Sequence, residues 1–330
     1  MRERVLITGA SGFVGYHLVE AATQAGMEVY AAIRPSSEVG HLAPFNIKYT
    51  TLDFKDTSAL VKELEDKQYH YIIHAAGITK AKTAQEYNKV NATFTQNLAS
   101  AATKASIPLK KFVFISSLAA LGPVSYTDTM GINEQSKAQP VTAYGKSKLL
   151  AEQHLSEFES LPLTILRPTA VYGPREKDIF IILKTLNLGV EPYISRKPQW
   201  LSFVYVKDLA KAVMLALGAS INHASYNVSD GNTYDRYALA SITKRVLGKK
   251  TVKFHIPVGM MNVMASLLEA AYAASDKTPA LNKEKLNELT AENWNCSIAK
   301  IRKDLGFVPE YDLEHGLELT LKWYKENNWL

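Results

Sequence analysis

The chain has 330 residues and a formal net charge of +6, with 47% apolar and 21% charged residues, as is ordinary for a globular protein of one or two domains. Its lysines and arginines are scattered rather than gathered into a stripe, which argues against a nucleic-acid-binding surface. The single cysteine, Cys296, excludes an internal disulfide framework and favours a reducing, cytoplasmic environment.

Short β-branched or aromatic segments alternate with helical segments through the first two-thirds of the chain. Such alternation predicts an α/β fold, a Rossmann-type doubly wound parallel sheet with helices on both faces. The first strand begins at Val5, so no signal peptide is expected before it. Strands are expected at Val5–Thr8, Val29–Ile33, Ile47–Thr51, Tyr71–His74, Lys111–Ser116 and Leu163–Arg167, and helices at Gly15–Ala25, Thr57–Leu64, Asn91–Lys104 and Thr142–Glu159.

Beyond Arg167 this alternation weakens, and prolines and glycines divide the chain into loops and short elements. We therefore expect a smaller, mostly helical C-terminal region that covers the substrate. The predicted division assigns residues 1–170 and 200–232 to the Rossmann domain, and residues 171–199 and 233–330 to the substrate-binding region.

The stretch from Ile256 to Ala274 is mostly apolar. Pro257, Gly259 and several polar residues interrupt it, so it makes a poor membrane-spanning helix and no stable membrane insertion is expected. We interpret it as a buried helix that lines an apolar pocket. The alternative is a helix that contacts a membrane surface.

Three glycines follow the first predicted strand and open the first helix. Glycines at such a place let the backbone turn tightly and approach a pyrophosphate at the helix N-terminus. Their G-x-x-G-x-x-G spacing differs from the common G-x-G-x-x-G, but the strand–loop–helix context supports a dinucleotide site. The predicted loop contributes Gly9, Ser11, Gly12, Phe13, Val14 and Gly15.

The acidic residue that would bind a ribose 2′-hydroxyl after the second strand is absent at its expected place. Arg34 stands there instead, and Ser36 and Ser37 follow it. A guanidinium and two hydroxyls suit a 2′-phosphate, so NADP(H) is the preferred cofactor. The alternative is NAD(H), with Arg34 as a surface residue.

Further motifs resemble those of the extended short-chain dehydrogenase/reductases, also called the epimerase/dehydratase family. The likeness covers essentially the whole chain, and as a set the motifs are highly specific. The matching segments are TGASGFVG from Thr8, LDFKD from Leu52, HAAG from His74, VNATFTQNL from Val90, FISSLAALG from Phe114, YGKSK from Tyr144, LRPTAVYGPR from Leu166 and FVYVKDLAKA from Phe203.

This resemblance implies roles for further residues. Asp53 would contact the adenine of the cofactor, and Asn91 would help to order the site. The expected cofactor-binding set is completed by Ala75, Ala76 and Gly77 along the ribose and phosphates, and by Phe54, Pro168 and Val171 from the same motifs.

Tyr144 and Lys148 form a Y-x-x-x-K motif on one predicted helix, and Ser117 follows the strand before it. A phenol with a pKa of about 10 is a poor proton shuttle at neutral pH. Lys148 lies one turn further along the same helix face, so its charge should lower the pKa of Tyr144. Ser117 would hydrogen-bond the substrate oxygen, which makes these three the predicted catalytic residues. The eight histidines are dispersed, so no metal site is predicted.

At some motif positions this chain differs from particular branches of the family, and these differences reduce the number of candidate activities. Dehydratases of nucleotide sugars usually carry Thr-Asp-Glu at the catalytic serine, where this chain has Ser117 followed by leucine and alanine. Sugar-nucleotide epimerases usually carry an asparagine where Ala170 stands, and a diphosphate-binding arginine within the run that begins here at Trp200. The chain is more similar to the hydroxysteroid dehydrogenase and dihydroflavonol reductase branch, which takes apolar substrates.

We therefore predict an NADP(H)-dependent reductase or dehydrogenase that acts on a secondary alcohol or carbonyl of a small-molecule substrate. One alternative is an NAD-dependent nucleotide-sugar epimerase. Another is a non-enzymatic cofactor sensor, which the presence of both Tyr144 and Lys148 disfavours. The resemblance also implies a homodimer formed through the two helices at residues 91–104 and 142–159.

Overall fold

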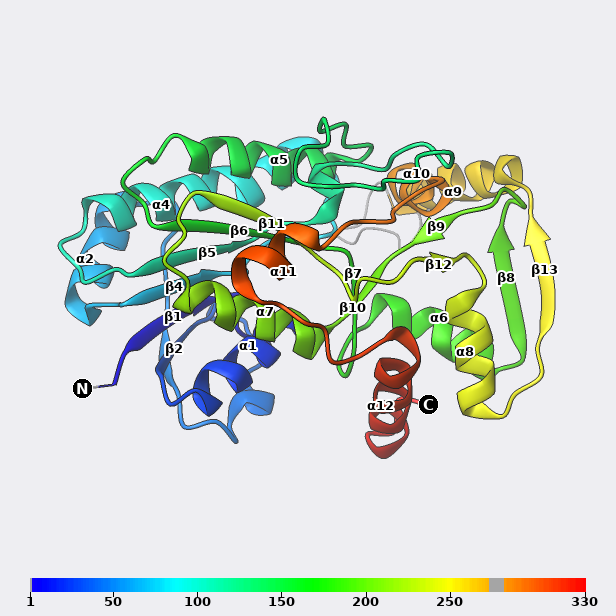
Figure 1. Ribbon diagram of the computed structural model, residues 1–330, viewed down its shortest axis with the longest axis horizontal. Coiled ribbons are helices and arrows are strands. Elements are labelled where there is room, and N and C mark those ends of the chain that lie inside the picture. Colours follow the sequence, from blue (N-terminus) through cyan, green and yellow to red (C-terminus); the bar gives the residue numbers. More distant parts are fainter. Residues whose placement is uncertain (1, 273–281) are drawn as a thin grey trace.

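The computed structural model describes residues 2–272 and 282–330. Its centre is a sheet of seven parallel strands in the order β11-β6-β5-β4-β1-β2-β3, which confirms the predicted Rossmann-type α/β fold (Figure 1). The strand order reverses between β1 and β4, and in such sheets ligands bind at this switch point, beyond the carboxyl ends of the strands. The strands span Arg4–Thr8 (β1), Glu28–Ala32 (β2), Lys48–Thr50 (β3), Tyr71–His74 (β4), Lys111–Ile115 (β5), Leu163–Pro168 (β6) and Ala224–Val228 (β11).

Two apolar layers cover the sheet. Successive side chains of β1 enter different layers, since Val5 and Ile7 join one core cluster and Leu6 joins the other. Helices α1 and α7 pack together on the first face, and α2, α4 and α5 cover the second (Figure 1). These helices span Phe13–Gln24 (α1), Val206–Gly218 (α7), Thr57–Lys67 (α2), Phe94–Lys104 (α4) and Ala143–Ser156 (α5).

The structure differs from the predicted elements in several places, and helix α7 is one element that was not predicted. Strand β11 was missed because its sequence, ASYNV, mixes small and polar residues, although it pairs along its whole length with β6. The helix expected from Asn91 begins earlier, after a short helix at Ala84–Tyr87 (α3), with a π-helical turn at Asn88–Thr93. Such turns widen a helix locally and are frequent at functional sites.

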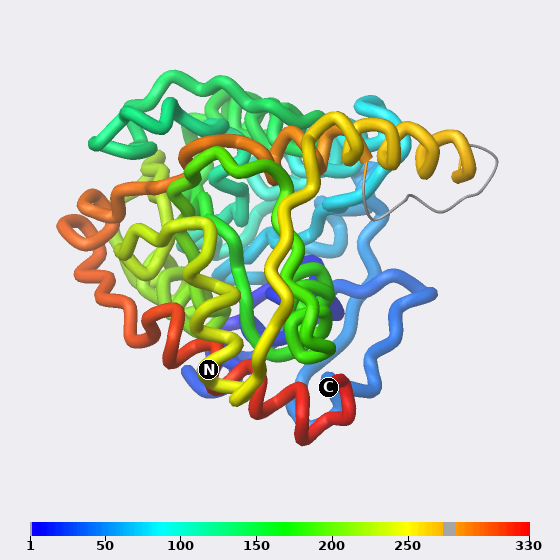
Figure 2. The backbone as a smooth tube through the Cα atoms, turned by 90° about the vertical axis from the view of Figure 1, so that its right-hand side faces the viewer, coloured from blue at the N-terminus to red at the C-terminus, as the bar shows by residue number. Residues whose placement is uncertain are grey.

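The described residues of the C-terminal region form helices and three two-stranded sheets, in which β7 pairs with β10, β8 with β13, and β9 with β12. Its own apolar core contains Tyr172, Leu183, Leu317 and Tyr324. Figure 2 views the outer side of this region, with α9 above and the C-terminal helix α12 below. The elements are Ala170–Tyr172 (β7), Asp178–Asn187 (α6), Val190–Ile194 (β8), Trp200–Leu201 (β9), Phe203–Tyr205 (β10), Tyr234–Asp235 (β12), Ala238–Leu247 (α8), Val252–Ile256 (β13), Val258–Tyr272 (α9), Lys283–Thr290 (α10), Ala299–Leu305 (α11) and Leu313–Glu326 (α12).

The expected buried helix at 256–274 is α9 for its described part, and the prediction of burial is wrong. Within α9, Met261 and Ala265 are buried, whereas most of the other large apolar side chains face solvent. The last two residues of the predicted segment lie outside the described residues. No helix in the described part of the chain is long and apolar enough to cross a membrane.

Candidate active site

The glycine-rich loop joins β1 to α1 and touches the end of β4. Gly9 has a φ of +71°, and a Cβ added there would lie 2.8 Å from backbone atoms of Ala75 and Ala76. A Cβ on Gly15 would lie 2.0 Å from the carbonyl oxygen of Gly9, so a side chain at either position would displace the loop. Gly12 begins α1 without a capping side chain, which leaves first-turn N–H groups available to an anionic ligand.

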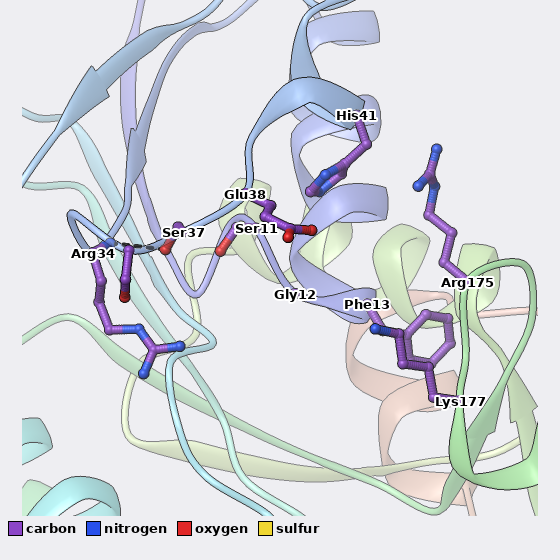
Figure 3. A pocket seen from close by; sticks show the side chains of 10 residues that line it. Ser11, Gly12, Phe13, Arg34, Ser37, Glu38, His41, Arg175 and Lys177 are labelled. Atoms are coloured by element: carbon purple, nitrogen blue, oxygen red, sulfur yellow. Dashed lines mark hydrogen bonds between the residues drawn. The ribbon is translucent and has the colours of Figure 1, made fainter.

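A cavity of about 350 Å³ lies beside this loop (Figure 3). On one side, Arg34 and Ser37 form a turn, since each main-chain N–H donates to the other residue, at 3.1 Å to Ser37 Oγ and 2.9 Å to the Arg34 carbonyl. On the other side, Arg175 and Lys177 approach from the segment after β7. The lining residues are Ser11, Gly12, Phe13, Arg34, Ser36, Ser37, Glu38, His41, Arg175 and Lys177.

Positive charge predominates in this cavity. Arg34, Arg175 and Lys177 face it together with one carboxylate, that of Glu38. The Arg175 guanidinium lies 4.2 Å from the centroid of the Tyr16 ring, a cation–π contact that positions it. Together with the free N–H groups of α1, these cations fit the phosphates of a dinucleotide.

Asp53 and Phe54 follow β3, outside that cavity lining. Asp53 is exposed, and its carboxylate accepts the main-chain N–H of Lys55 at 3.0 Å. Phe54 is half-buried and stacks on Phe94 with 5.8 Å between ring centroids. Asp53 stabilises a turn in this structure, and its expected contact with adenine stays a prediction.

The segment after β4 is fixed to β1 by a buried histidine. His74 Nδ1 lies 2.7 Å from Thr8 Oγ1, and its Nε2 lies 2.8 Å from Thr95 Oγ1. Burial, reinforced by the charge of Lys148, lowers the pKa of His74 to about 3, so the ring is neutral. The Ala76 N–H donates to Thr8 Oγ1 at 3.1 Å, which holds the expected cofactor-binding alanines beside the glycine loop.

Asn91 lies fully buried in the π-helical turn and orders the next stretch of this segment. Its Oδ1 accepts the Ile78 N–H at 2.8 Å, and its Nδ2 donates to the Ile78 carbonyl at 3.0 Å and to Ser147 Oγ at 2.9 Å. A Cβ on Gly77 would meet Asn91 Oδ1 at 3.1 Å and Lys148 Nζ at 3.4 Å. The expected ordering role of Asn91 therefore has a geometric basis.

The three predicted catalytic residues lie beyond the carboxyl end of β5. Thr142 caps α5 by accepting the Gly145 N–H at 3.0 Å, so that Tyr144 and Lys148 follow in the first turns. Lys148 is buried, and its Nζ donates to the carbonyl oxygen of Ile115 at 2.9 Å. Ser117 begins a short 3₁₀ turn at Leu118–Ala120.

The expected lowering of the Tyr144 pKa is not what the structure gives. Burial raises this pKa to about 12, and the hydrogen bond with Ser117 opposes that shift only in part. Burial also lowers the pKa of Lys148 to about 8. The ammonium of Lys148 is directed at the Ile115 carbonyl, so its charge does not offset the desolvation of the phenol.

Comparisons with known proteins agree with this architecture. The model of the NAD-dependent epimerase/dehydratase family matches residues 5–229. The chain belongs to this family. It is thus an extended short-chain dehydrogenase/reductase, in a family whose members are enzymes.

Relatives within the family differ in their named substrates. The chain is 26% identical to a ceramide reductase of Caulobacter vibrioides, over 99% of this chain and 96% of that protein. It is also 26% identical to an undecaprenol-diphosphate-linked N-acetylglucosamine 4-epimerase of Escherichia coli, over 98% and 96%. A UDP-glucuronic acid 4-epimerase of Bacillus cereus, solved in complex with NAD, superposes with a TM-score of 0.77 at 22% identity, over 98% and 99%.

A buried ion pair fixes α5, the helix that carries the predicted catalytic residues Tyr144 and Lys148. Arg167 Nε donates to both oxygens of Glu152, at 3.0 and 3.1 Å, and its Nη2 donates to Oε2 at 2.6 Å. The Ser116 hydroxyl donates to Glu152 Oε1 at 2.5 Å. Since Glu152 lies one turn beyond Lys148, this network links α5 to the ends of β5 and β6. Sequence reasoning missed it, because its members lie far apart in the chain.

The last two predicted cofactor residues lie near the same strand ends. Pro168 is the final residue of β6, next to Val228 of β11. Val171 lies in β7, where it pairs with Val204 and packs against the first core layer. Their positions leave a cofactor contact as a prediction.

Helix α10 of the C-terminal region contacts the start of α5. Glu284 accepts the main-chain N–H of Ala143 at 2.9 Å, and the charge of Glu288 contributes to the raised pKa of Tyr144. The Tyr87 ring lies 6.2 Å from that of Tyr144. Tyr87, Glu284 and Glu288 lie in no motif that the sequence analysis identified, and the same is true of Glu38, His41 and Lys177. Only the folding of the chain brings these residues to the site.

Proposed function

We propose that this family member is an NADP(H)-preferring reductase or dehydrogenase that acts on a secondary alcohol, or its carbonyl, carried by an apolar substrate. The observation that supports it best is the joint position of Ser117, Tyr144 and Lys148 beyond the carboxyl end of β5, where Tyr144 and Ser117 are hydrogen-bonded and Lys148 donates to the Ile115 carbonyl. When bound, the nicotinamide supplies or accepts the hydride.

In the direction of reduction, the Ser117 hydroxyl donates a hydrogen bond to the substrate oxygen as negative charge develops there. The Tyr144 phenol, whose pKa of about 12 keeps it protonated at neutral pH, gives its proton to the same oxygen. Lys148, with a pKa of about 8, then returns a proton to the tyrosinate near neutral pH. The Glu152 charge favours the protonated form of Lys148.

The preference for NADP(H) is supported by the cavity beside the glycine loop. Arg34, Ser36 and Ser37 lie on one side of it, and they offer a guanidinium and hydroxyls to a 2′-phosphate. Arg175 and Lys177 add further positive charge. Glu38 is the one acidic group in the lining, and NAD(H) is the alternative cofactor.

The residues at the position of the epimerases' diphosphate-binding arginine support an apolar substrate, because this chain has Trp200 and Leu201 there. Trp200 stacks on Tyr126 with 5.6 Å between ring centroids, and Leu201 packs against the apolar core of the C-terminal region. One relative is named a ceramide reductase, which fits a substrate with long apolar chains. The alternative, a nucleotide-sugar epimerase, is favoured by Arg196 and Arg236, which line a cavity of about 270 Å³ next to Trp200.

The mechanism is tested by Tyr144→Phe. We expect turnover to fall by about 10²–10⁴, because the proton donor is lost, while the dissociation constant of NADPH stays unchanged. Tyr87→Phe is the matched control, since it removes a neighbouring phenol hydroxyl that donates to the Thr79 carbonyl. Full activity of Tyr144→Phe would rule the mechanism out.

Reductase and epimerase are distinguished by the nucleotide that the purified protein retains. Mass spectrometry of the denatured protein identifies it. Stoichiometric, tightly held NAD would favour the epimerase, which regenerates its cofactor within each cycle. A site that exchanges its nucleotide and takes up NADPH in preference to NADH would favour the reductase.

A further inference from the structure

The turn that joins β7 to α6 holds Arg175 in a backbone conformation that glycine adopts more easily than any other residue. The φ of Arg175 is +76°, which lies in the left-handed region. Strain of this kind persists only where the surrounding structure imposes it, and it is frequent at ligand sites. We therefore examined which contacts hold the turn and what its arginine faces.

Two helices far apart in the sequence hold this turn in place. From α1, His17 Nε2 lies 3.2 Å from the carbonyl oxygen of Pro174. From α12, the buried Tyr324 hydroxyl donates to the carbonyl oxygen of Glu176 at 2.8 Å and lies 3.2 Å from that of Gly173. The turn is thus fixed between the helix that follows the glycine loop and the helix near the end of the chain.

Aromatic rings of the same two helices hold the Arg175 side chain. Its guanidinium carbon lies 4.2 Å from the centroid of the Tyr16 ring in α1, and 5.4 Å from that of the Trp323 ring in α12. Such cation–π contacts engage the charge of the guanidinium and leave its N–H donors for other partners. They also place the side chain before a ligand arrives, which reduces the entropy lost on binding.

In the described parts of the chain, the Arg175 side chain forms no hydrogen bond and no ion pair. The acidic residues closest to it in sequence are engaged elsewhere. The Glu176 carboxylate accepts main-chain N–H groups at the start of α6, and Asp178 pairs with Lys80 at 2.7 Å. Arg175 is therefore a positioned cation whose donors are available to a ligand.

Arg175 faces the cavity beside the glycine loop, together with Arg34 and Lys177. Figure 3 shows Arg34 and Arg175 on opposite sides of that loop. Burial, reinforced by the charge of Arg175, lowers the pKa of His41, so this ring adds no charge near neutral pH. Cations that share one cavity repel each other, and an anion between them removes that repulsion. Guanidinium groups match phosphate oxygens through paired hydrogen bonds, so a phosphate fits this place.

We infer that Arg175 binds a phosphate of the cofactor, and that Trp323 of α12 positions Arg175 for this contact. The inference rests on the proposed cofactor site and extends it into the C-terminal region. Trp323 acts through Arg175 and touches no cofactor atom itself. The adenosine 2′-phosphate and the pyrophosphate offer Arg175 the same oxygen ligands, and the choice of nucleotide in the test distinguishes them.

The test is the dissociation constant of NADPH and of NADH, measured by fluorescence titration without substrate. Arg175→Ala should raise the dissociation constant of NADPH by about 10–100-fold, because charge-assisted hydrogen bonds are lost. A matching rise for NADH assigns Arg175 to the pyrophosphate, and a rise for NADPH alone assigns it to the 2′-phosphate. Lys184→Ala is the matched control and should change neither constant, since Lys184 Nζ lies 5.8 Å from the Phe180 ring centroid, outside the cavity lining.

The positioning role is tested at Trp323. Trp323→Leu should raise the dissociation constant of NADPH by about 3–10-fold, and Trp323→Phe, which keeps an aromatic face, should restore most of the affinity. With Arg175→Ala already present, Trp323→Leu should have no further effect.

Two outcomes would overturn the inference. One is unchanged binding of both nucleotides by Arg175→Ala. The other is a loss of the same size from Trp323→Leu with and without Arg175, which would make the role of Trp323 purely structural. Tighter binding of NADH than of NADPH by the unaltered chain would instead refute the proposed cofactor preference and leave the role of Arg175 intact.

Discussion

Replacing Glu152 by glutamine removes the carboxylate that balances the Arg167 guanidinium. The Glu152 and Arg167 side chains are 6% and 10% exposed, and three of the hydrogen bonds to Glu152 come from Arg167. The variant keeps the shape of the side chain but leaves a buried cation without its counter-charge. Removing one partner of a buried ion pair costs about 3–5 kcal/mol of the free energy of unfolding.

This cost sets the expected shift in melting temperature. An unfolding entropy of about 2.1 cal/mol/K per residue gives roughly 0.7 kcal/mol/K for a chain of 330 residues. A loss of about 3–5 kcal/mol therefore lowers Tm by about 4–7 °C. The midpoint is measured by circular dichroism for the unaltered chain and for Glu152→Gln.

A double-mutant cycle tests whether the pair itself is the cause. Glu152→Leu with Arg167→Met replaces both charges by apolar groups, and we expect it to recover most of the loss, leaving at most about 2 kcal/mol, which includes the unpaired Ser116 hydroxyl. Additive losses in Glu152→Leu and Arg167→Met, with no coupling energy, would refute the reasoning. A second readout is the pH profile of turnover, because loss of the Glu152 charge should lower the pKa of Lys148 further.

Two further predictions concern the cofactor and pH. Arg34→Ala should weaken NADPH binding by about 10–100-fold and leave NADH binding unchanged, as measured by fluorescence titration. The control is Arg245→Ala, which removes an exposed arginine paired with Glu314. Equal losses of affinity for both nucleotides in Arg34→Ala would contradict a contact between Arg34 and the 2′-phosphate. The pKa of His74 is about 3 in the folded chain and about 6.5 in the unfolded chain. As the pH falls from about 6.5 towards 3, the imidazole is therefore protonated in the unfolded chain and stays neutral in the folded one. His74 should therefore lower the free energy of unfolding by about 1.4 kcal/mol for each pH unit of this fall. Urea unfolding at several pH values should show that the free energy of unfolding of His74→Gln depends less on pH by about this amount. An unchanged pH dependence in His74→Gln would contradict the prediction.

Much of the site could be predicted because its signals are local. The spacing of Tyr144 and Lys148 places both on one helix face, and three glycines after a strand indicate a phosphate loop. The alternation of strands and helices predicted the parallel sheet, whose formation depends on the same local periodicity. Strand β11 was missed because tertiary pairing with β6, rather than its own residues, makes it a strand. The homodimer, the cytoplasmic location and the domain division stay predictions.

The sequence by itself thus determined the fold class, and it indicated the predicted phosphate loop and the three predicted catalytic residues, because these signals are local. Tertiary structure decided the rest. It brought Arg175 to the glycine loop, and it buried Tyr144 so that desolvation, rather than the Lys148 charge, sets the phenol pKa. It also turned one apolar face of α9 outward. Burial and contacts between distant segments depend on how elements pack, and local spacing does not record them.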